Sequence, residues 1–184
     1  MRIIGGTARG RRLKAPKGSA IRPTADRVRE ALFNILPRDW SGRRVLDLFA
    51  GSGSLSLEAL SRGAASALLV DESAEAAGLI RSNLQTLGFM DRARIWAQPV
   101  GKALGRLADE GAAYDVVFLD PPYDDGWVGK AMAAISRGAM LGAGGIVAAE
   151  HSVRERVEEQ YGEVVRRDRR QYGDTVLSFF ESHN

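Results

Sequence analysis

The succession of apolar segments predicts an α/β fold built on a mostly parallel sheet. Short apolar runs alternate with amphipathic stretches of helical length between residues 44 and 150, turn residues separate them, and the last two apolar runs follow each other without a helix. Strands that alternate with helices pair in parallel and are covered on both faces. Two consecutive strands joined by a tight turn predict instead an antiparallel hairpin, which fits best at the edge of the sheet.

The apolar runs predict seven strands, at residues 44–50, 67–71, 93–97, 114–120, 144–150, 163–173 and 174–181. Helices are expected at about 54–62, from Ser73 to 87, in a short stretch that ends near 109, and at 127–141. Ser73 is suited to the first position of its helix, because a serine side chain accepts a hydrogen bond from a free amide there. The following helix has one apolar face, formed by Ala76, Leu79, Ile80, Leu84 and Leu87.

The N-terminal residues predict a small extension at 1–40, followed by a main domain at 41–184. The stretch RIIGGTARGRRLKAP has two short apolar segments around a turn rich in Gly and Arg, which predicts a small hairpin or an irregular arm. A helix is expected after Thr24, a good capping residue, and Pro37 ends it. Its apolar positions recur at helical spacing, at Val28, Leu32, Ile35 and Leu36.

The composition is that of a globular protein, with 45% hydrophobic and 27% charged residues in a chain of 184, enough for one well-buried core. The chain has no cysteine, which excludes disulfides and thiolate metal sites, and its two histidines argue against a histidine metal site. We therefore expect no bound metal. The N-terminus lacks the apolar stretch of a secretory signal, and no segment approaches the ~20 apolar residues of a membrane span. We expect a cytoplasmic protein.

The charge is distributed unevenly along the chain. Residues 1–44 carry 12 Lys and Arg against 3 Asp and Glu, while the remainder carries 14 against 20. A basic segment on an acidic body predicts a polyanionic partner, often nucleic acid, although a solvated basic tail has the same composition. The second basic cluster RRDRR, at 166–170, favours a binding surface.

A glycine turn follows the first expected strand of the main domain. The sequence RVLDLFA runs into GSGS, where Gly51 and Gly53 allow a sharp turn and a close approach to a ligand. Asp71 ends the next strand, 20 residues beyond Gly51, where its carboxylate is placed to accept hydrogen bonds from ribose hydroxyls. Ligands of open parallel sheets lie outside the carboxyl ends of the strands. Together these features predict a ligand that contains a nucleoside, although a plain strand–turn–helix connection remains open.

The residues around the turn limit which nucleoside-containing ligands are compatible with the sequence. Ser56 occupies the place of the third glycine in a dinucleotide fingerprint, and no G-x-x-x-x-G-K-[ST] segment occurs. Asp47, close to the turn, would repel a pyrophosphate but could meet an ammonium group. A ligand with a ribose, an amine and no phosphate is S-adenosylmethionine.

The segment FLDPPYDD closes the fourth expected strand of the main domain with a rigid corner. Pro121 and Pro122 cannot continue a sheet ladder, so the chain leaves the sheet stiffly, with Asp120 and Tyr123 on either side. We expect this strand to neighbour the first one, which puts the corner next to the glycine turn. A rigid loop that only closes a strand would have the same two prolines.

The corner suits methyl transfer to an exocyclic amine of a nucleobase. Such an amine is a poor nucleophile, because its lone pair is delocalised into the ring. Hydrogen bonds to the Asp120 carboxylate and a backbone carbonyl would draw its N–H bonds out of the ring plane, and Tyr123 would stack on the base. Orientation can supply several kcal/mol of such a barrier, and the carboxylate can stabilise the positive charge that develops.

Five segments together resemble one family. [D/N/S]-P-P-[Y/F/W] marks amino-methyltransferases of nucleobases, and RIIGGTARGRRLKAP, RPTADRVREALFNIL, VLDLFAGSGSLSLEALSRGA, FLDPPY and YGDT resemble, in this order, the RsmD family. Members of that family are bacterial 16S rRNA guanine-N2 methyltransferases. The resemblance covers nearly the whole chain. It implies a class I, Rossmann-like methyltransferase fold, a seven-stranded mostly parallel sheet with an antiparallel C-terminal hairpin and a small N-terminal extension.

The resemblance also implies site residues. Asp120, Pro121, Pro122 and Tyr123 form the catalytic corner. The residues that the resemblance implies as cofactor-binding are Asp47, Phe49, Ala50, Gly51, Ser52, Gly53, Asp71, Glu72, Gln98 and Val100. The implied substrate is one guanine of 16S rRNA, within an assembling 30S subunit and splayed from its stack; the implied enzyme is a monomer. Candidate contacts with RNA phosphates are Arg9, Arg11, Arg12, Arg22, Arg27 and Arg29.

Two features depart from the family pattern. Ser54 and Ser56 replace the small apolar or glycine residues that are more usual after the glycine turn. Many class I members also place an acid after the third strand to bind the adenine amino group, whereas this chain has Pro99 there. Adenine recognition would then depend on backbone groups or on Gln98.

Three other functions are compatible with parts of the sequence. A DNA amino-methyltransferase fits the Asp-Pro-Pro-Tyr corner, but the chain leaves little room for a target-recognition domain. A non-catalytic RNA-binding assembly factor is disfavoured because Asp120 and the glycines are intact. A nicotinamide oxidoreductase is disfavoured by Ser56 and by the lack of a residue set for hydride chemistry.

Overall fold

The computed structural model describes residues 1–15, 23–123 and 125–182, which fall into two compact units, Met1–Gln98 and Pro99–Asn184. Each unit is described by itself. The expected domain boundary after residue 40 stays a prediction. Residues 1–15, hereafter the N-terminal arm, are hydrogen-bonded within the first unit.

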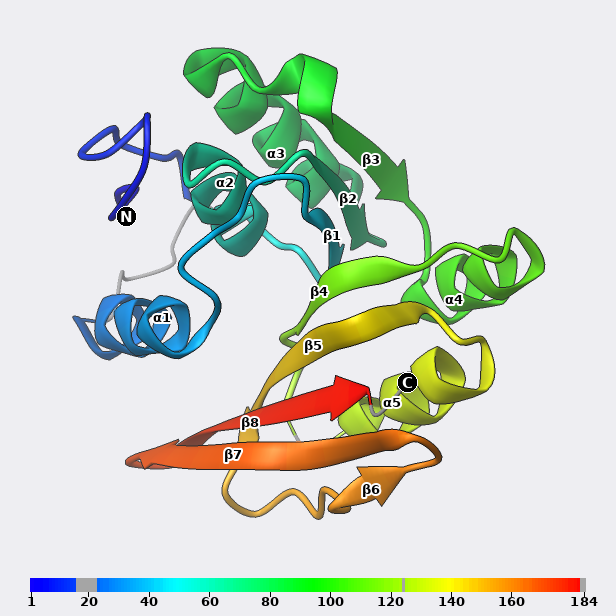
Figure 1. The fold of residues 1–184 in the computed structure, drawn as a ribbon. Coiled ribbons are helices and arrows are strands. Elements are labelled where there is room, and N and C mark those ends of the chain that lie inside the picture. Colours follow the sequence, from blue (N-terminus) through cyan, green and yellow to red (C-terminus); the bar gives the residue numbers. More distant parts are fainter. Residues whose placement is uncertain (16–22, 124, 183–184) are drawn as a thin grey trace. The chain divides into compact units, whose positions relative to one another are not determined.

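The first unit contains three parallel strands in the order β3-β2-β1, with helices packed against them (Figure 1). Its strands are β1 (Arg44–Leu48), β2 (Ser66–Asp71) and β3 (Ala93–Ala97). Its helices are α1 (Pro23–Ile35), α2 (Ser54–Ser61), α3 (Ala74–Leu87) and the 3-10 turn η1 (Met90–Arg92). Apart from the exposed Arg44 and Ser66 and the half-buried Asp71, the side chains of β1 and β2 are buried, as expected of parallel strands covered on both faces.

Helices α2 and α3 of the first unit lie where the sequence predicts them, to within one residue. The Ser73 side chain accepts a hydrogen bond from the amide of Ala76 and caps α3, and Gly88 ends that helix in the left-handed conformation at φ 73°. Helix α1 begins at Pro23 rather than after Thr24, since proline is pre-organised for the first helical position. The N-terminal arm is an irregular hairpin, in which Arg2 and Arg12 form an isolated antiparallel bridge.

The second unit contains the other five strands of the described residues. β4 (Tyr114–Leu119) pairs in parallel with β5 (Leu141–Ser152), and β8 (Thr175–Ser182), β7 (Val164–Tyr172) and β6 (Gln160–Tyr161) follow in antiparallel order. Helices α4 (Val100–Asp109) and α5 (Trp127–Arg137) pack on each other, and α5 also packs on β5 and β6 (Figure 1). The predicted seven strands are all present, and the antiparallel C-terminal hairpin is confirmed as β7–β8.

Three details differ from the prediction. Strand β6 has only two residues, too few to show a pattern in the sequence, and it raises the number of described strands to eight. The helix expected to reach 141 ends at Arg137, because Gly138 caps it and Ala139 is left-handed at φ 47°. β5 then begins at Leu141 and extends to Ser152, longer at both ends than expected. Among the described residues, no helix is long and apolar enough to cross a membrane.

Candidate active site

The glycine turn between β1 and α2 has three residues in the left-handed region. Gly51 has φ 55° and Gly53 φ 77°, and between β1 and Gly51 the bulky Phe49 has φ 64°. A Cβ at Gly53 would lie 3.0 Å from Leu69 Cδ2, so the turn needs glycine there for space as well as for conformation. A bulky residue with positive φ is rare and is concentrated at ligand sites. The turn therefore has the backbone expected of a ligand cradle.

Asp71 connects the end of β2 to this turn. Its Oδ2 accepts a hydrogen bond from the amide of Gly51 at 2.8 Å, and its Oδ1 accepts one from the amide of Ser73 at 2.9 Å. The carboxylate is only partly exposed, and it keeps further lone pairs for hydroxyl donors. The structure thus places Asp71 beside the turn, as the sequence predicted, and adds that it fixes the turn's shape.

Asp47 lies inside the first unit rather than facing a ligand's ammonium group. Its carboxyl is 2% exposed, and its Oδ2 accepts hydrogen bonds from the Oγ of Ser56 at 2.8 Å and from the amide of Ser56 at 3.2 Å. Burial raises the pKa of Asp47 to about 7, against the lowering effect of the Ser56 hydrogen bonds. We therefore assign it the role of holding the first turn of α2 beneath the glycine turn. This explains Ser56, because its hydroxyl donates to Asp47 and a glycine has no side chain to do so.

Gln98 carries a buried donor that has no partner in the described part of the chain. Its amide N–H binds the carbonyl of Asp71 at 3.0 Å, which fixes it at the end of β3, while its side-chain Nε2 is buried without a hydrogen bond. Such an unsatisfied donor costs about 1–3 kcal/mol unless a ligand or water pairs with it. The position predicted for adenine recognition therefore contains a donor that needs an acceptor.

The other residues predicted to bind the cofactor divide into two groups. Ala50 and Ser52 belong to the turn itself: the amide of Ala50 binds the carbonyl of Val70, and the carbonyl of Ser52 accepts from Asn83. Glu72 is exposed just beyond Asp71, whereas Val100 is buried and opens α4 in the second unit. Glu72 and Val100 stay predictions.

The Asp-Pro-Pro-Tyr corner directly follows β4 in the second unit. Pro121 is buried, whereas Asp120, Pro122 and Tyr123 are exposed, with 45% of Tyr123 accessible. The Tyr123 hydroxyl donates a hydrogen bond to Oε1 of Glu150 at 2.8 Å and lies 3.2 Å from Oγ1 of Thr175. An aromatic ring that is accessible to solvent is thus held at its hydroxyl end.

Two carboxyl groups affect the electrostatics of the corner. Burial raises the pKa of Tyr123 to about 12, and the charges of Glu150 and Asp120 act in the same direction, which places both carboxylates near the phenol. Burial also raises the pKa of Glu150, while its hydrogen bond from Tyr123 lowers it. The phenol therefore stays protonated and donates at neutral pH.

Glu150 and Thr175 were not predicted as site residues. Glu150 ends the expected fifth strand, and Thr175 ends the YGDT segment. A carboxylate at the carboxyl end of a parallel strand was the available signal for Glu150. The glycine turn belongs to the first unit and the corner to the second, so the predicted adjacency of Asp120 to the methyl donor stays a prediction.

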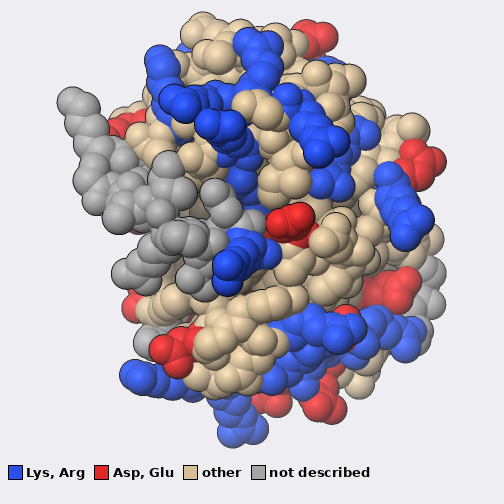
Figure 2. Space-filling model, turned by 90° about the vertical axis from the view of Figure 1, so that its left-hand side faces the viewer, with Lys and Arg blue, Asp and Glu red and all other residues tan. Residues whose placement is uncertain are grey.

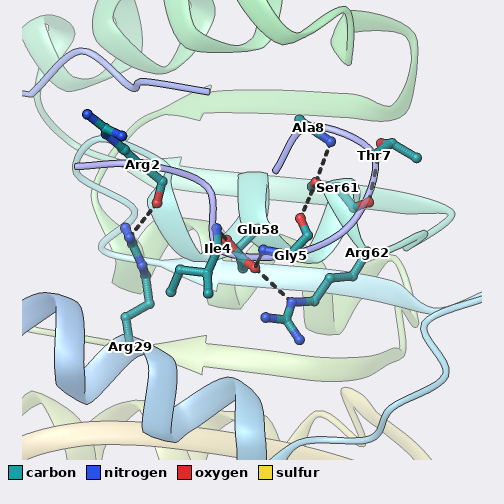
Figure 3. A network of polar contacts seen from close by, with 9 residues as sticks. All are labelled: Arg2, Ile4, Gly5, Thr7, Ala8, Arg29, Glu58, Ser61 and Arg62. Carbon is teal, nitrogen blue, oxygen red and sulfur yellow. Dashed lines mark hydrogen bonds and ion pairs between the residues drawn. The ribbon is translucent and has the colours of Figure 1, made fainter. Parts of the chain in front are cut away.

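The N-terminal arm is fixed on α2 by a buried glutamate (Figure 3). Glu58, whose side chain is 0% exposed, accepts hydrogen bonds from the amides of Ile4 at 2.7 Å and Gly5 at 2.8 Å, and it pairs with Nε of Arg62 at 2.8 Å. Ser61 adds a second attachment, since its Oγ donates to the carbonyl of Gly5 and accepts from the amide of Ala8. The arm is therefore an ordered part of the first unit and not a solvated tail.

Asn83 attaches the arm also to α3 and to the glycine turn. The side chain of Asn83, 1% exposed, binds both the amide and the carbonyl of Lys14, at 2.8 and 3.1 Å, and it donates to the carbonyl of Ser52 at 3.1 Å. Arg11 reaches the carbonyl of Thr86 from the arm. One buried amide thus connects the arm to the candidate cofactor loop.

The fixed arm presents its cations outward. Figure 2 shows Lys and Arg gathered on the upper part of the face that it draws, where the arm lies. Five basic side chains of the arm are exposed: Arg2, Arg9, Arg11, Arg12 and Lys14.

The remaining predicted phosphate contacts have different positions. Arg27 is exposed on α1. Arg29 is 7% exposed and donates to the carbonyl of Arg2 at 2.6 Å, so it supports the arm from α1 and does not face solvent (Figure 3). Its expected contact with RNA is inconsistent with this placement. Arg22 lies outside the described residues.

Comparison with known proteins identifies the family. The model of the family described as conserved hypothetical protein 95 matches residues 1–181. YlbH of Bacillus subtilis (strain 168), provisionally named an rRNA methyltransferase, is 36% identical over 181 residues, 98% of each chain. Ribosomal RNA small subunit methyltransferase D of Escherichia coli (strain K12) is 44% identical over 126 residues, which cover 68% of this chain and 62% of that one.

Solved structures share the fold. The structure of yhhF from Escherichia coli, provisionally named a methyltransferase, is 34% identical, with a TM-score of 0.86 over 99% of this chain and 97% of that one. At 17% identity, SMU.776, provisionally named a methyltransferase and complexed with S-adenosylhomocysteine, shares the fold with a TM-score of 0.67 over 84% of this chain and 48% of that one. The predicted class I methyltransferase fold is thereby confirmed.

Proposed function

The chain belongs to the conserved hypothetical protein 95 family, and on this premise we propose that it is an S-adenosylmethionine-dependent rRNA methyltransferase. The finer proposal is methyl transfer to the exocyclic N2 amine of one guanine of 16S rRNA, in the cytoplasm and during assembly of the small subunit. The observation that carries the proposal is the corner that follows β4, where a carboxylate and an accessible tyrosine ring flank two prolines.

The residues of the first unit fit S-adenosylmethionine. The positive-φ turn at Gly51 and Gly53 allows close approach of the methionine part, and Asp71 offers acceptor lone pairs to ribose hydroxyls. The buried Nε2 of Gln98 lacks a partner and suits a ring nitrogen of adenine as acceptor. When bound, the cofactor supplies a methyl group activated by a sulfonium.

The corner residues would prepare the acceptor amine. The Asp120 carboxylate would accept an N–H of the guanine N2 amine and favour the positive charge that develops on nitrogen as the new C–N bond forms and the bond from the methyl group to sulfur breaks. The methylated amine would then release its extra proton to solvent. The exposed ring of Tyr123 stacks on the splayed base and fixes its plane. The buried Pro121 restricts the loop that carries both groups, so the geometry is set before the substrate binds.

The ordered arm would bind the phosphate backbone. Exposed Arg9, Arg11 and Arg12 lie on a segment that Glu58 and Asn83 fix in place, and Arg27 is exposed on α1. Cations on an ordered scaffold lose less entropy on binding than cations on a mobile tail. We propose that these four arginines contact RNA and that the enzyme acts as a monomer.

The experiment compares Asp120→Ala with the control Asp125→Ala, an exposed carboxylate of the same loop. Labelled S-adenosylmethionine is incubated with 30S particles from cells that lack the modification, and S-adenosylhomocysteine binding is measured by calorimetry. We expect Asp120→Ala to lose roughly 100-fold or more in methyl transfer, the scale for losing one group that stabilises developing charge. Cofactor affinity should be nearly unchanged. An Asp120→Ala protein as active as Asp125→Ala would contradict the assigned role.

A further inference from the structure

The hydroxyl of Tyr123 is held from two neighbouring strands. It donates to Oε1 of Glu150, on β5, at 2.8 Å and lies 3.2 Å from Oγ1 of Thr175, the first residue of β8. Both distances are in the range of well-formed hydrogen bonds or close to it. The proposed reaction assigns no role to Glu150 or Thr175.

The sheet fixes these two partners relative to each other. β5 and β8 are antiparallel, with Glu150 opposite Leu177 and Ser152 opposite Thr175. Opposite residues project from the same face of a sheet, and so do residues two apart on one strand. Glu150 and Thr175 are therefore diagonal neighbours on one face, and the backbone ladder, not a mobile loop, sets their separation.

The two hydrogen bonds have a defined direction. The phenol donates its proton to the carboxyl oxygen Oε1 of Glu150. Its own oxygen is then the acceptor for the Thr175 hydroxyl, which donates. A phenolic O–H lies close to the plane of its ring, because the oxygen is conjugated with it. Two partners whose positions are fixed by the sheet therefore limit rotation of the ring about its long axis. At the other end of that axis, the two prolines stiffen the backbone of Tyr123.

We propose that Glu150 and Thr175 are positioning residues, which orient the ring of Tyr123 so that its accessible face receives the guanine. This inference rests on the proposed function and adds to it a device for aligning the base. It also explains the YGDT segment, whose threonine places a hydroxyl donor at the corner. A tyrosine needed only for apolar stacking would not require either partner.

The experiment measures kcat and KM for methyl transfer to 30S particles by a set of variants. Thr175→Val and Glu150→Ala each remove one partner, Thr175→Ser and Glu150→Gln keep one, and Tyr123→Phe removes the hydroxyl. Loss of one hydrogen bond corresponds to roughly 10-fold in rate. We expect kcat to fall by about this factor for Thr175→Val and Glu150→Ala, with most of the rate restored in Thr175→Ser and Glu150→Gln. The KM for S-adenosylmethionine should stay unchanged.

Double variants distinguish positioning from other roles. If Glu150 and Thr175 act through the hydroxyl, then Glu150→Ala and Thr175→Val cause no further loss of kcat in the Tyr123→Phe protein. An additional loss there would show that they act on the substrate directly or through the fold, and it would overturn the inference. Full activity of Glu150→Ala and of Thr175→Val in the otherwise wild-type protein would also overturn the inference. Wild-type protein that transfers no methyl group would instead overturn the proposed function, and the inference with it.

Discussion

The most informative perturbation of the N-terminal arm is Glu58→Ala. The Glu58 carboxylate is fully buried and receives three hydrogen bonds, from Ile4, Gly5 and Arg62, at 2.7–2.8 Å. A hydrogen bond to a charged group contributes about 1.5–3 kcal/mol, and removal of one partner of a buried pair costs about 3–5 kcal/mol. Arg62, 24% exposed, can return to water, so we take the lower part of this range. We expect the free energy of unfolding to fall by about 3 kcal/mol.

The assay is urea unfolding followed by circular dichroism, together with trypsin cleavage at the arginines of the arm. Trypsin should cut the arm of Glu58→Ala much faster than that of the wild type, because the amides of Ile4 and Gly5 lose their acceptor and the arm detaches. Glu58→Gln should be intermediate, since it keeps one acceptor oxygen. Glu75→Ala, an exposed glutamate in the first turn of α3, is the matched control and should change stability by less than about 1 kcal/mol.

The arm also connects stability to RNA binding. Since its cations sit on the segment that Glu58 holds, Glu58→Ala should weaken RNA binding even though no basic residue is removed. A variant that loses less than about 1 kcal/mol and keeps wild-type protease resistance would refute the idea that Glu58 anchors the arm. Loss of stability with unchanged RNA affinity would refute only the link between an ordered arm and binding.

Three further predictions concern pH, salt and cofactor. Burial raises the pKa of Asp47 from 3.8 in the unfolded chain to about 7 in the folded protein. Its contribution to stability is therefore complete below about pH 4 and is lost as the pH rises to 7. Unfolding free energy should fall with pH by up to about 1.4 kcal/mol per unit between pH 5 and 7, and Asp47→Asn should remove most of this slope in urea titrations. Replacing Arg11 and Arg12 by Gln should lower the slope of log affinity for RNA against log salt by up to about 2 in filter binding, whereas an unchanged slope would mean that neither side chain contacts phosphate. Asp71→Asn should weaken S-adenosylhomocysteine binding roughly 10-fold in calorimetry, because it loses acceptors for the ribose and for the amide of Gly51; equal affinity would remove Asp71 from the site.

The local chemistry of the glycine turn and the corner was predictable from the sequence. Gly51 and Gly53 adopt the positive φ angles that only glycine accepts readily, and Asp71 lies beside them, as the spacing of 20 residues indicated. The alternation of apolar runs likewise predicted the strands, and it predicted which of them are parallel and which are antiparallel. Parallel strands need a long connection, usually a helix, whereas antiparallel strands can be joined by a tight turn.

Partners far apart in the sequence could not be predicted. Glu58 is an acidic residue in a short helix, and nothing local distinguishes it from a solvated glutamate; its role comes from the amides of Ile4 and Gly5, more than 50 residues away. Arg29 was predicted as an RNA contact because its charge is visible in the sequence and its burial is not. The Tyr123–Glu150 hydrogen bond similarly depends on tertiary structure.

The proposed function predicts methyl transfer by this chain to N2 of a guanine in small-subunit rRNA. The most direct measurement incubates the protein and labelled S-adenosylmethionine with 30S particles from cells that lack the modification, and then digests the rRNA to nucleosides for chromatography. We predict label in N2-methylguanosine from 16S rRNA, and none in parallel reactions with DNA. Label in a methylated adenine or cytosine would contradict the assignment to guanine, and absence of transfer by a protein that binds S-adenosylhomocysteine would contradict the proposed catalytic function on these particles.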